Sequence, residues 1–519
     1  MNLGNFPEPP NLSAWGLQAD CPHKQENLLN WHDASIWPSG SVPTADSLTP
    51  VDLPVGVKVV ISSRSLLPGT YGLITVPETT ELIFADEEIS LHTVGMSVNG
   101  AVKAGSPTCR LLGGTVTVTL HGARPANVTT VDNSFKGIVV NGAGVLSLHG
   151  APFYQTWSRL ATTAMEGENV LYLQDAINWQ AGQEVVITTS QHKDSRDWHQ
   201  NEVRTIDFVK ACSHLGDGVT AVVFTEPLSY GHFGGVEYQA EVGLLSRRII
   251  IQGSEDDSEP TDIEPIACDD NDYFGSFPCP DSFLTGYGAT VVAIGSGGAS
   301  LQLSNVEFFR VGQTNARGRY PVHFHLVVDG STSYIEDCSF HRSYNKAVVV
   351  HGTNFARVSR NVAYDVIGHA FYLQDGVEEE NIIEFNLAAH VHSLGPPVVG
   401  TSNLYAQNLD DVFESEDNRD PVDATACGFY FANAYNTIRG NAGVGGFSCF
   451  HFPNLERPVG LHRTVVMAPY GRPTLQFDAN SCRSSGFWWT KAGGEQDCFF
   501  KVDSLCAAFF HCSPLYAFF

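Results

Sequence analysis

The residues best suited to chemistry are two histidines that lie two positions apart in the apolar stretch 319–326. The β-branched and aromatic residues around them predict a strand. Because side chains alternate along a strand, His323 and His325 face one side while Val322 and Phe324 face the other, apolar side. Two imidazoles on the outer face of a strand can transfer protons or bind a metal ion.

A repeat of 23 residues follows directly after this strand. Residues 335–352 align without a gap on residues 358–375, an offset of 358 − 335 = 23. In this alignment Val348 falls on Phe371, and other apolar positions likewise fall on apolar positions. A period in the twenties with short strands is typical of a solenoid, and we predict a right-handed parallel β-helix from about residue 290 to 462.

The same alignment gathers the polar residues into one column. His325 falls over His351, Gln374 is next in that column, and Asp375 is one position beyond it. Neighbouring coils of a β-helix lie ~4.8 Å apart, so stacked imidazoles could share a divalent cation. Imidazole ligands suit zinc, whereas calcium would prefer oxygen ligands. We predict His323, His325 and His351 as catalytic residues or as metal ligands.

Each of these residues has a structural interpretation as well. The histidines could form a hydrogen-bonded ladder on the outside of the sheet, and Asp375 could simply be the turn residue before Gly376. Cleavage of a glycosidic bond normally needs two carboxyl groups. Asp375 is the best candidate for one of them, and the acidic loop 410–423 offers others.

The remainder of the chain also predicts an all-β protein. Charged residues make up only 16% of it, and 49 glycines punctuate short apolar runs, a pattern of strands and tight turns. We divide the chain into an irregular segment (1–30), a glycine-rich β domain (31–160), a β linker region (161–289) with an acidic excursion (254–283), the β-helix (290–462) and a C-terminal cap or truncated tail (463–519).

Composition narrows the classes of partner. The formal net charge is −27, which argues against nucleic acid, because phosphate binding needs a basic surface. Twelve cysteines without a CxxC pair, together with the sequons at Asn11 and Asn127, favour an exported protein with disulfides. No signal peptide or membrane-spanning stretch is recognised. We therefore expect a secreted protein or an ectodomain, attached to a membrane only through a segment absent from this chain.

Several ordered motifs resemble one known family. Residues 37–160 resemble the G8 domain, named for its eight glycines. The family that contains CEMIP (cell migration-inducing and hyaluronan-binding protein), the related transmembrane hyaluronidase and fibrocystin-L is similar in five strings: EVGLLSR (241–247), RYPVHFH (319–325), VHG (350–352), GH (368–369) and QDG (374–376).

This resemblance implies a glycan-directed extracellular protein. For the first two relatives it implies depolymerisation of hyaluronan, and for fibrocystin-L no established catalysis. We therefore expect a hyaluronidase-like glycoside hydrolase, with a polysaccharide lyase or a noncatalytic carbohydrate-binding or adhesion module as alternatives. Arg317, Arg319, His369 and Gln374 are the predicted contacts to an anionic sugar chain such as hyaluronan.

Overall fold

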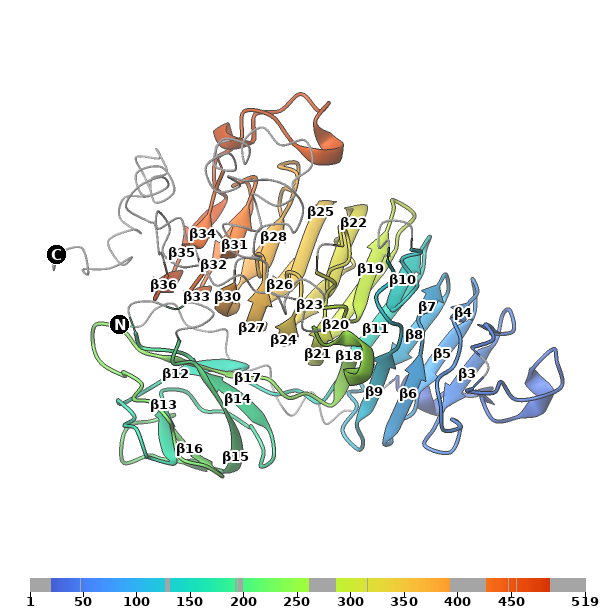
Figure 1. Ribbon diagram of the computed structural model, residues 1–519, viewed down its shortest axis with the longest axis horizontal. Helices are drawn as coiled ribbons and strands as arrows, with labels where there is room; N and C mark the ends of the chain where they lie inside the picture. Colours follow the sequence, from blue (N-terminus) through green and yellow to red (C-terminus); the bar gives the residue numbers. More distant parts are fainter. Residues whose placement is uncertain are drawn as a thin grey trace.

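The computed structural model describes residues 20–485 apart from 47, 127–130, 192–193, 195–198, 261–285, 315, 393–425, 447 and 454. In this part the chain forms a long solenoid of three parallel sheets, with a smaller antiparallel unit beside it (Figure 1). The all-β parallel β-helix predicted from the repeat is confirmed. Among the residues described, the helical elements are short turns between the strands: η1 (Pro22–Lys24), η2 (Ala34–Ile36), α2 (Glu255–Ser258), η6 (Gly460–His462) and η7 (Pro469–Gly471).

Each turn of the solenoid contributes strands to the three sheets. The first sheet contains, in spatial order, β1 (Leu29–Asn30), β3 (Lys58–Ile61), β5 (Glu81–Phe84), β8 (Ala101–Ala104), β11 (Val145–His149), β20 (Ser300–Ser304), β23 (Tyr334–Glu336), β26 (Arg357–Ser359), β29 (Ile382–Glu384), β32 (Thr437–Arg439) and β35 (Gln476–Asp478). The second contains β2 (Val51–Asp52), β4 (Ile74–Val76), β7 (Met96–Val98), β10 (Gly137–Asn141), β19 (Thr290–Ile294), β22 (Val322–Asp329), β25 (Val348–Asn354), β28 (Phe371–Leu373), β31 (Cys427–Phe431) and β34 (Ser448–His451). The third contains β36 (Ser481–Arg483), β33 (Ala442–Val444), β30 (Leu387–His392), β27 (Val362–Ile367), β24 (Ser339–Ser343), β21 (Val306–Val311), β18 (Ile249–Gly253), β9 (Val116–Leu120) and β6 (Ile89–Thr93).

The glycine-rich segment forms the first coils of this same solenoid. Strand β10 pairs with β19, and β11 pairs with β20, so all three sheets run on without a break from the N-terminal coils. Glycine is required where coils approach closely. A Cβ at Gly100 would lie 2.2 Å from the Thr80 carbonyl oxygen, and Gly105 adopts a φ of +71°, which residues with a Cβ rarely adopt.

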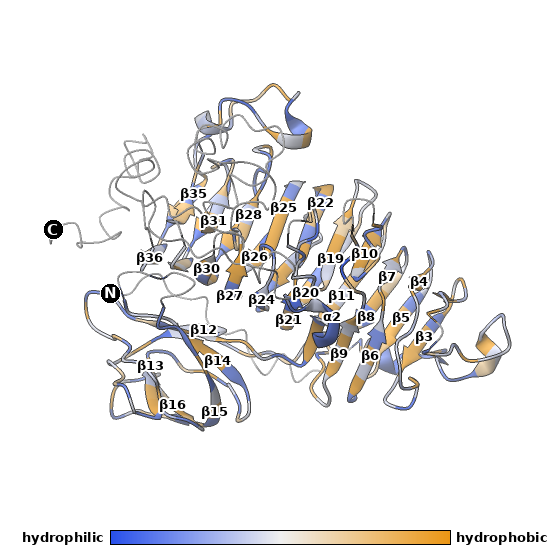
Figure 2. Cartoon of the chain, viewed as in Figure 1, coloured by the Kyte–Doolittle hydropathy of each residue, from blue (hydrophilic) through white to orange (hydrophobic). Residues whose placement is uncertain are grey.

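The inward-facing residues are those that the repeat predicts. Val348 pairs with Phe371, and Val350 pairs with Leu373, on adjacent strands. All four lie with Val322 and Phe324 in one continuous apolar core, at 1% exposure or less. The apolar strands of the solenoid stand out in Figure 2. Alternation along each strand therefore turns His323, and in register with it Val349 and Tyr372, to the outer face of the second sheet.

The segment predicted as a β linker region forms a small antiparallel barrel. Its strands, in spatial order, are β12 (Trp157–Arg159), β17 (Glu241–Leu244), β14 (Glu184–Ile187), β15 (Glu202–Ala211), β16 (Thr220–Phe224) and β13 (Val170–Leu173). A bridge between Leu160 and Leu173 joins its two edges. The barrel has its own apolar core, and Trp157 and Val186 pack against the third sheet of the solenoid.

Two disulfides join distant parts of the described chain. Cys21 pairs with Cys109 near the N-terminal end, and Cys449 in β34 pairs with Cys482 in β36. No helix in the described residues is long and apolar enough to cross a membrane. The acidic excursion from residue 261 onward, the loop 410–423 and the tail from residue 486 lie outside the described residues.

Candidate functional site

The three histidines meet on the outer face of the second sheet. His325 on β22 is the register partner of His351 on β25, as the repeat predicts. The His325 and His351 ring centroids lie 5.0 Å apart, and those of His323 and His351 lie 5.9 Å apart with parallel planes. Their ligand nitrogens fall within 4.8 Å of one another. The rigid pairing of two strands therefore places three imidazoles together.

Hydrogen bonds fix which nitrogen of each ring carries its proton. His323 Nδ1 donates to the Gly318 carbonyl oxygen at 3.1 Å, which leaves a lone pair on Nε2. That Nε2 is buried and has no hydrogen-bond partner. His351 Nε2 donates to Asp375 Oδ2 at 2.9 Å, which leaves the lone pair on Nδ1. Two lone pairs are thus fixed by what the opposite ring nitrogen binds.

His325 completes the group. Its Nδ1 lies 3.1 Å from His351 Nδ1 and, because the lone pair of His351 is on that nitrogen, donates a hydrogen bond to it. Burial and the neighbouring His351 lower the pKa of His325 to about 4. Burial, His325 and His351 also place the pKa of His323 well below its ordinary value. The lowered pKa values of His323 and His325 favour neutral imidazole, the form in which histidine binds metals.

Asp375 connects the cluster to a distant part of the chain. Its Oδ2 accepts hydrogen bonds from His351, from His462 Nδ1 at 2.8 Å and from the Leu461 amide at 3.0 Å. Burial raises the pKa of Asp375, but the hydrogen bonds from His351 and His462 outweigh it and bring the pKa to about 2. Asp375 is therefore a carboxylate that orients His351.

A second carboxylate, Glu378, stabilises the turn that carries Asp375. It is fully buried and accepts hydrogen bonds from the backbone amides of Gly352, Asp375 and Gly376. Burial, together with the charge of Asp375, raises the pKa of Glu378. Nothing in the repeat singles out Glu378, because its hydrogen-bond partners are backbone amides, which leave no mark in the sequence.

His462 is the residue of the site that the repeat could not reveal. It lies in η6, 87 residues beyond Asp375. Gly460 makes its approach possible, since a Cβ there would lie 2.5 Å from Asp375 Oδ1. His462 also packs edge-on against the ring of His351. The hydrogen bond to Asp375 raises the pKa of His462.

Other residues predicted to bind sugar occupy different surroundings. Arg319 is buried and donates hydrogen bonds to the carbonyl oxygens of Val131 and Phe135. Its guanidinium therefore binds the backbone of an earlier segment and does not face solvent. His369 is buried among aromatic rings and accepts a hydrogen bond from the Cys427 amide. Neither joins the histidine cluster.

Arg317 and Gln374 lie nearer to the cluster. Arg317 is exposed, and its charge acts on His325. Gln374 follows β28 directly before Asp375 and is buried, and its side-chain oxygen has no hydrogen-bond partner. Arg317 is therefore the predicted sugar contact that both lies at the cluster and faces solvent.

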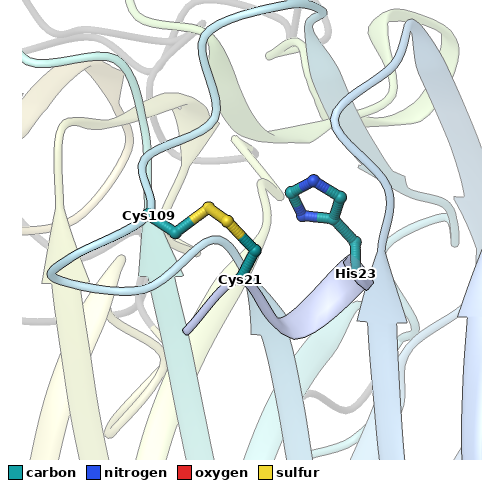
Figure 3. A group of neighbouring side chains, drawn as sticks. All are labelled: Cys21, His23 and Cys109. Atoms are coloured by element: carbon teal, nitrogen blue, oxygen red, sulfur yellow. A yellow bond between two sulfur atoms is a disulfide. The ribbon is translucent and has the colours of Figure 1, made fainter. Parts of the chain in front are cut away.

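Two further groups in the described residues bring possible metal ligands together. One is His351, Asp375 and His462, but Asp375 Oδ2 already accepts three hydrogen bonds there. The other is Cys21, His23 and Cys109 (Figure 3). Its two sulfur atoms are bonded to each other as a disulfide, so they are not thiolate ligands.

Comparison with known proteins agrees with this architecture. The family model described as the G8 domain matches residues 36–161, and the one described as the CEMIP beta-helix matches residues 286–488. The chain therefore contains a G8 domain followed by a CEMIP-type β-helix, and the resemblance found in the sequence is confirmed.

Individual relatives include proteins of the slime mould Dictyostelium discoideum and of mammals. A G8 domain-containing protein of D. discoideum is 39% identical over 95% of this chain, and its Protein rliB is 39% identical over 90%. Human fibrocystin-L is 34% identical over 78% of this chain. The chain spans 32%, 38% and 9% of these relatives' lengths. Among solved structures, the tailspike gp61 of Pseudomonas phage phi297 aligns over 72% of this chain and 50% of its own with 8% identity and a TM-score of 0.16, which carries no inference.

Proposed function

We propose that this is an extracellular protein that acts on an anionic polysaccharide of the hyaluronan type. In this proposal His323, His325 and His351 bind a divalent metal ion at the site that contacts the polysaccharide. The supporting observation is the convergence of three imidazoles whose ligand nitrogens lie within 4.8 Å of one another. Hydrogen bonds made by the opposite ring nitrogen leave a lone pair on His323 Nε2 and on His351 Nδ1. The buried, unpartnered Nε2 of His323 is otherwise a costly arrangement.

The ligand set favours zinc or a similar transition metal over calcium. Three neutral imidazoles without an oxygen ligand suit zinc, whereas calcium takes six to eight oxygen ligands. The His351–Asp375 hydrogen bond has the form of the carboxylate–histidine pairs that support metal-bound histidines. For a cation to bind at Nδ1 of His325, the proton on that nitrogen would move to Nε2 of the same ring, and the hydrogen bond to His351 would be lost.

A bound cation would supply Lewis acidity toward a uronate carboxylate or a sugar oxygen. Two carboxylates would position the ligands of the cation. Asp375 accepts a hydrogen bond from the His351 ring, and Glu378 accepts one from the backbone amide of Asp375. Both carboxylates are buried and hydrogen-bonded, so neither resembles the accessible acid of a two-carboxylate glycosidase. Depolymerisation at this site would therefore depend on the cation, either by hydrolysis or by elimination at the uronate.

The same observation supports a second candidate function. With its carboxylates committed to hydrogen bonds, the site can hold an anionic sugar chain without cutting it. Such a noncatalytic binding or adhesion module is the alternative that the similarity to fibrocystin-L suggests.

One experiment tests both. The purified protein is analysed for bound metal, and fluorescent hyaluronan is then sized after incubation with it, with and without chelator. Metal-dependent shortening supports depolymerisation. Retention of the polymer without shortening supports the binding module, and protein that binds neither metal nor polymer contradicts the proposal.

The informative variant is His325→Ala, because His325 is half-buried and its ring hydrogen-bonds to His351. We expect it to lose bound metal while its melting temperature stays close to that of the wild type. His32→Ala, at an exposed histidine of the N-terminal coils, is the matched control and should keep the metal. Equal metal content in the two variants would refute the ligand assignment.

A further inference from the structure

Residues 455–472 form a strap that crosses the outer face of the second sheet beside the histidine cluster; it is the orange-red segment at the top of Figure 1. Leu455 and Val459 pack against Tyr320, Tyr372 and Tyr430 of the sheet. These contacts fix one side of the strap to the solenoid and leave the other to solvent.

The strap is also bound directly to the site. The Val459 amide donates to the main-chain oxygen of Asp375 at 2.9 Å, while the Leu461 amide and His462 donate to its carboxylate. Further along, Arg472 pairs with Glu379, with Nε 2.6 Å from Oε1. The strap therefore lies directly beside the histidine cluster and is held there by Asp375.

The charge of the strap is opposite to that of the chain. It contains three arginines, Arg457, Arg463 and Arg472, and one acid, Glu456, for a net charge of 3 − 1 = +2 with His462 neutral, whereas the chain carries −27. Arg457 and Arg463 are exposed, and in the described part of the chain no ion pair or hydrogen bond engages either side chain. Two exposed, unpaired arginines beside the histidine cluster create a local positive surface.

Exposed apolar side chains accompany these arginines. Leu461, Val466 and Tyr470 are 57%, 103% and 60% exposed, and Figure 2 shows hydrophobic and hydrophilic residues mixed along the segment. A sugar chain of uronates presents both carboxylates and apolar C–H faces. Arginines can pair with the carboxylates, and an exposed tyrosine offers a flat amphipathic surface for a ring face.

We propose that the strap is a docking surface for an anionic polysaccharide, with Arg457 and Arg463 binding its carboxylates next to the histidine site. This inference rests on the proposed function and names its specificity residues. A segment with exposed basic and apolar residues can also bind an anionic membrane surface. The strap contains only the three-residue turns η6 and η7, not the amphipathic helix typical of membrane-surface binding, so the observations favour the glycan.

The test compares two double variants of the full chain. Arg457→Gln with Arg463→Gln removes both strap charges. Lys24→Gln with Arg64→Gln removes two exposed charges from the N-terminal coils and is the matched control. Affinity is measured for a hyaluronan oligosaccharide of defined length, for neutral dextran and for phosphatidylserine vesicles, at low and physiological salt.

We expect the wild type to bind the hyaluronan oligosaccharide but neither dextran nor vesicles. The strap variant should bind it about tenfold or more weakly, with a smaller salt dependence, because it lacks two charge-assisted contacts. The control should bind as the wild type does. A strap variant with wild-type affinity, or a wild type that binds vesicles instead, overturns the proposal.

Metal content of the same samples separates the two proposals. If the wild type holds metal and the strap variant binds hyaluronan with undiminished affinity, the docking surface is wrong and the metal site stands. If no metal is found but affinity falls in the strap variant, the metal site is wrong and the docking surface stands.

Discussion

Asp375→Ala tests whether one carboxylate joins the histidine cluster to the strap. The substitution removes the acceptor for His351, His462 and the Leu461 amide. It keeps the main-chain oxygen that accepts from the Val459 amide. We therefore expect the strap to loosen around Leu461 first.

The magnitude follows from the bonds that are lost. A hydrogen bond to a charged group contributes about 1.5–3 kcal/mol. His462 is partly exposed, with its side chain at 24%, so water replaces much of its bond, and the Leu461 amide accounts for most of the loss. Local opening of the strap should become easier by about 2–3 kcal/mol, equivalent to about 30- to 160-fold.

Native-state hydrogen exchange measures this opening directly, since local unfolding exposes individual amides. Protection of the Leu461 amide should fall by that factor, and protection of the Val459 amide should fall less. Metal affinity of the same variant should drop about 10- to 100-fold, because the support of His351 is gone. Asp329→Ala is the control, since Asp329 is exposed and bonds to the nearby Ser331 amide.

Unchanged exchange at Leu461 in Asp375→Ala would show that the carboxylate does not hold the strap. Unchanged metal affinity would show that Asp375 does not orient a metal ligand. The two readouts are independent, so each link of the reasoning can fail separately.

Two further substitutions test the scaffold. Phe324→Ala should lower the free energy of unfolding by about 3–5 kcal/mol, because it leaves a cavity in the solenoid core; Phe355→Ala, at an exposed phenylalanine, should cost far less in the same denaturant titration. In the barrel, burial raises the pKa of Glu202, but hydrogen bonds from His232 and the Ser229 amide lower it overall. Its stabilising effect should thus be full above its ordinary pKa and be lost as the pH falls through the lowered value. The difference in melting temperature between wild type and Glu202→Gln should accordingly shrink as the pH is lowered below the ordinary pKa of a glutamate, and a difference that does not change would exclude a stabilising Glu202 carboxylate.

Residue alternation and the repeat length are enough to predict which residues face the core and which coils are neighbours. Alternation along a strand turns Phe324 inward and His323 outward, and the 23-residue period places His325 beside His351. Both features are local or involve adjacent coils, so they repeat in the sequence. The asparagines at 361, 386 and 441 recur on successive coils in the same way, and the side-chain oxygen of each accepts a hydrogen bond from a backbone amide of the preceding coil.

Completion of the site depends on contacts that no repeat encodes. His462 reaches Asp375 from 87 residues away, through a strap that obeys no repeat, so no spacing in the sequence predicts their contact. Arg319 lies in the motif but is drawn into the backbone of residues 131–135, while Arg457 and Arg463 lie outside it and remain exposed. A solenoid repeat encodes contacts between successive coils, and the path of a segment that crosses those coils depends on packing and hydrogen bonds that exist only once the coils have formed.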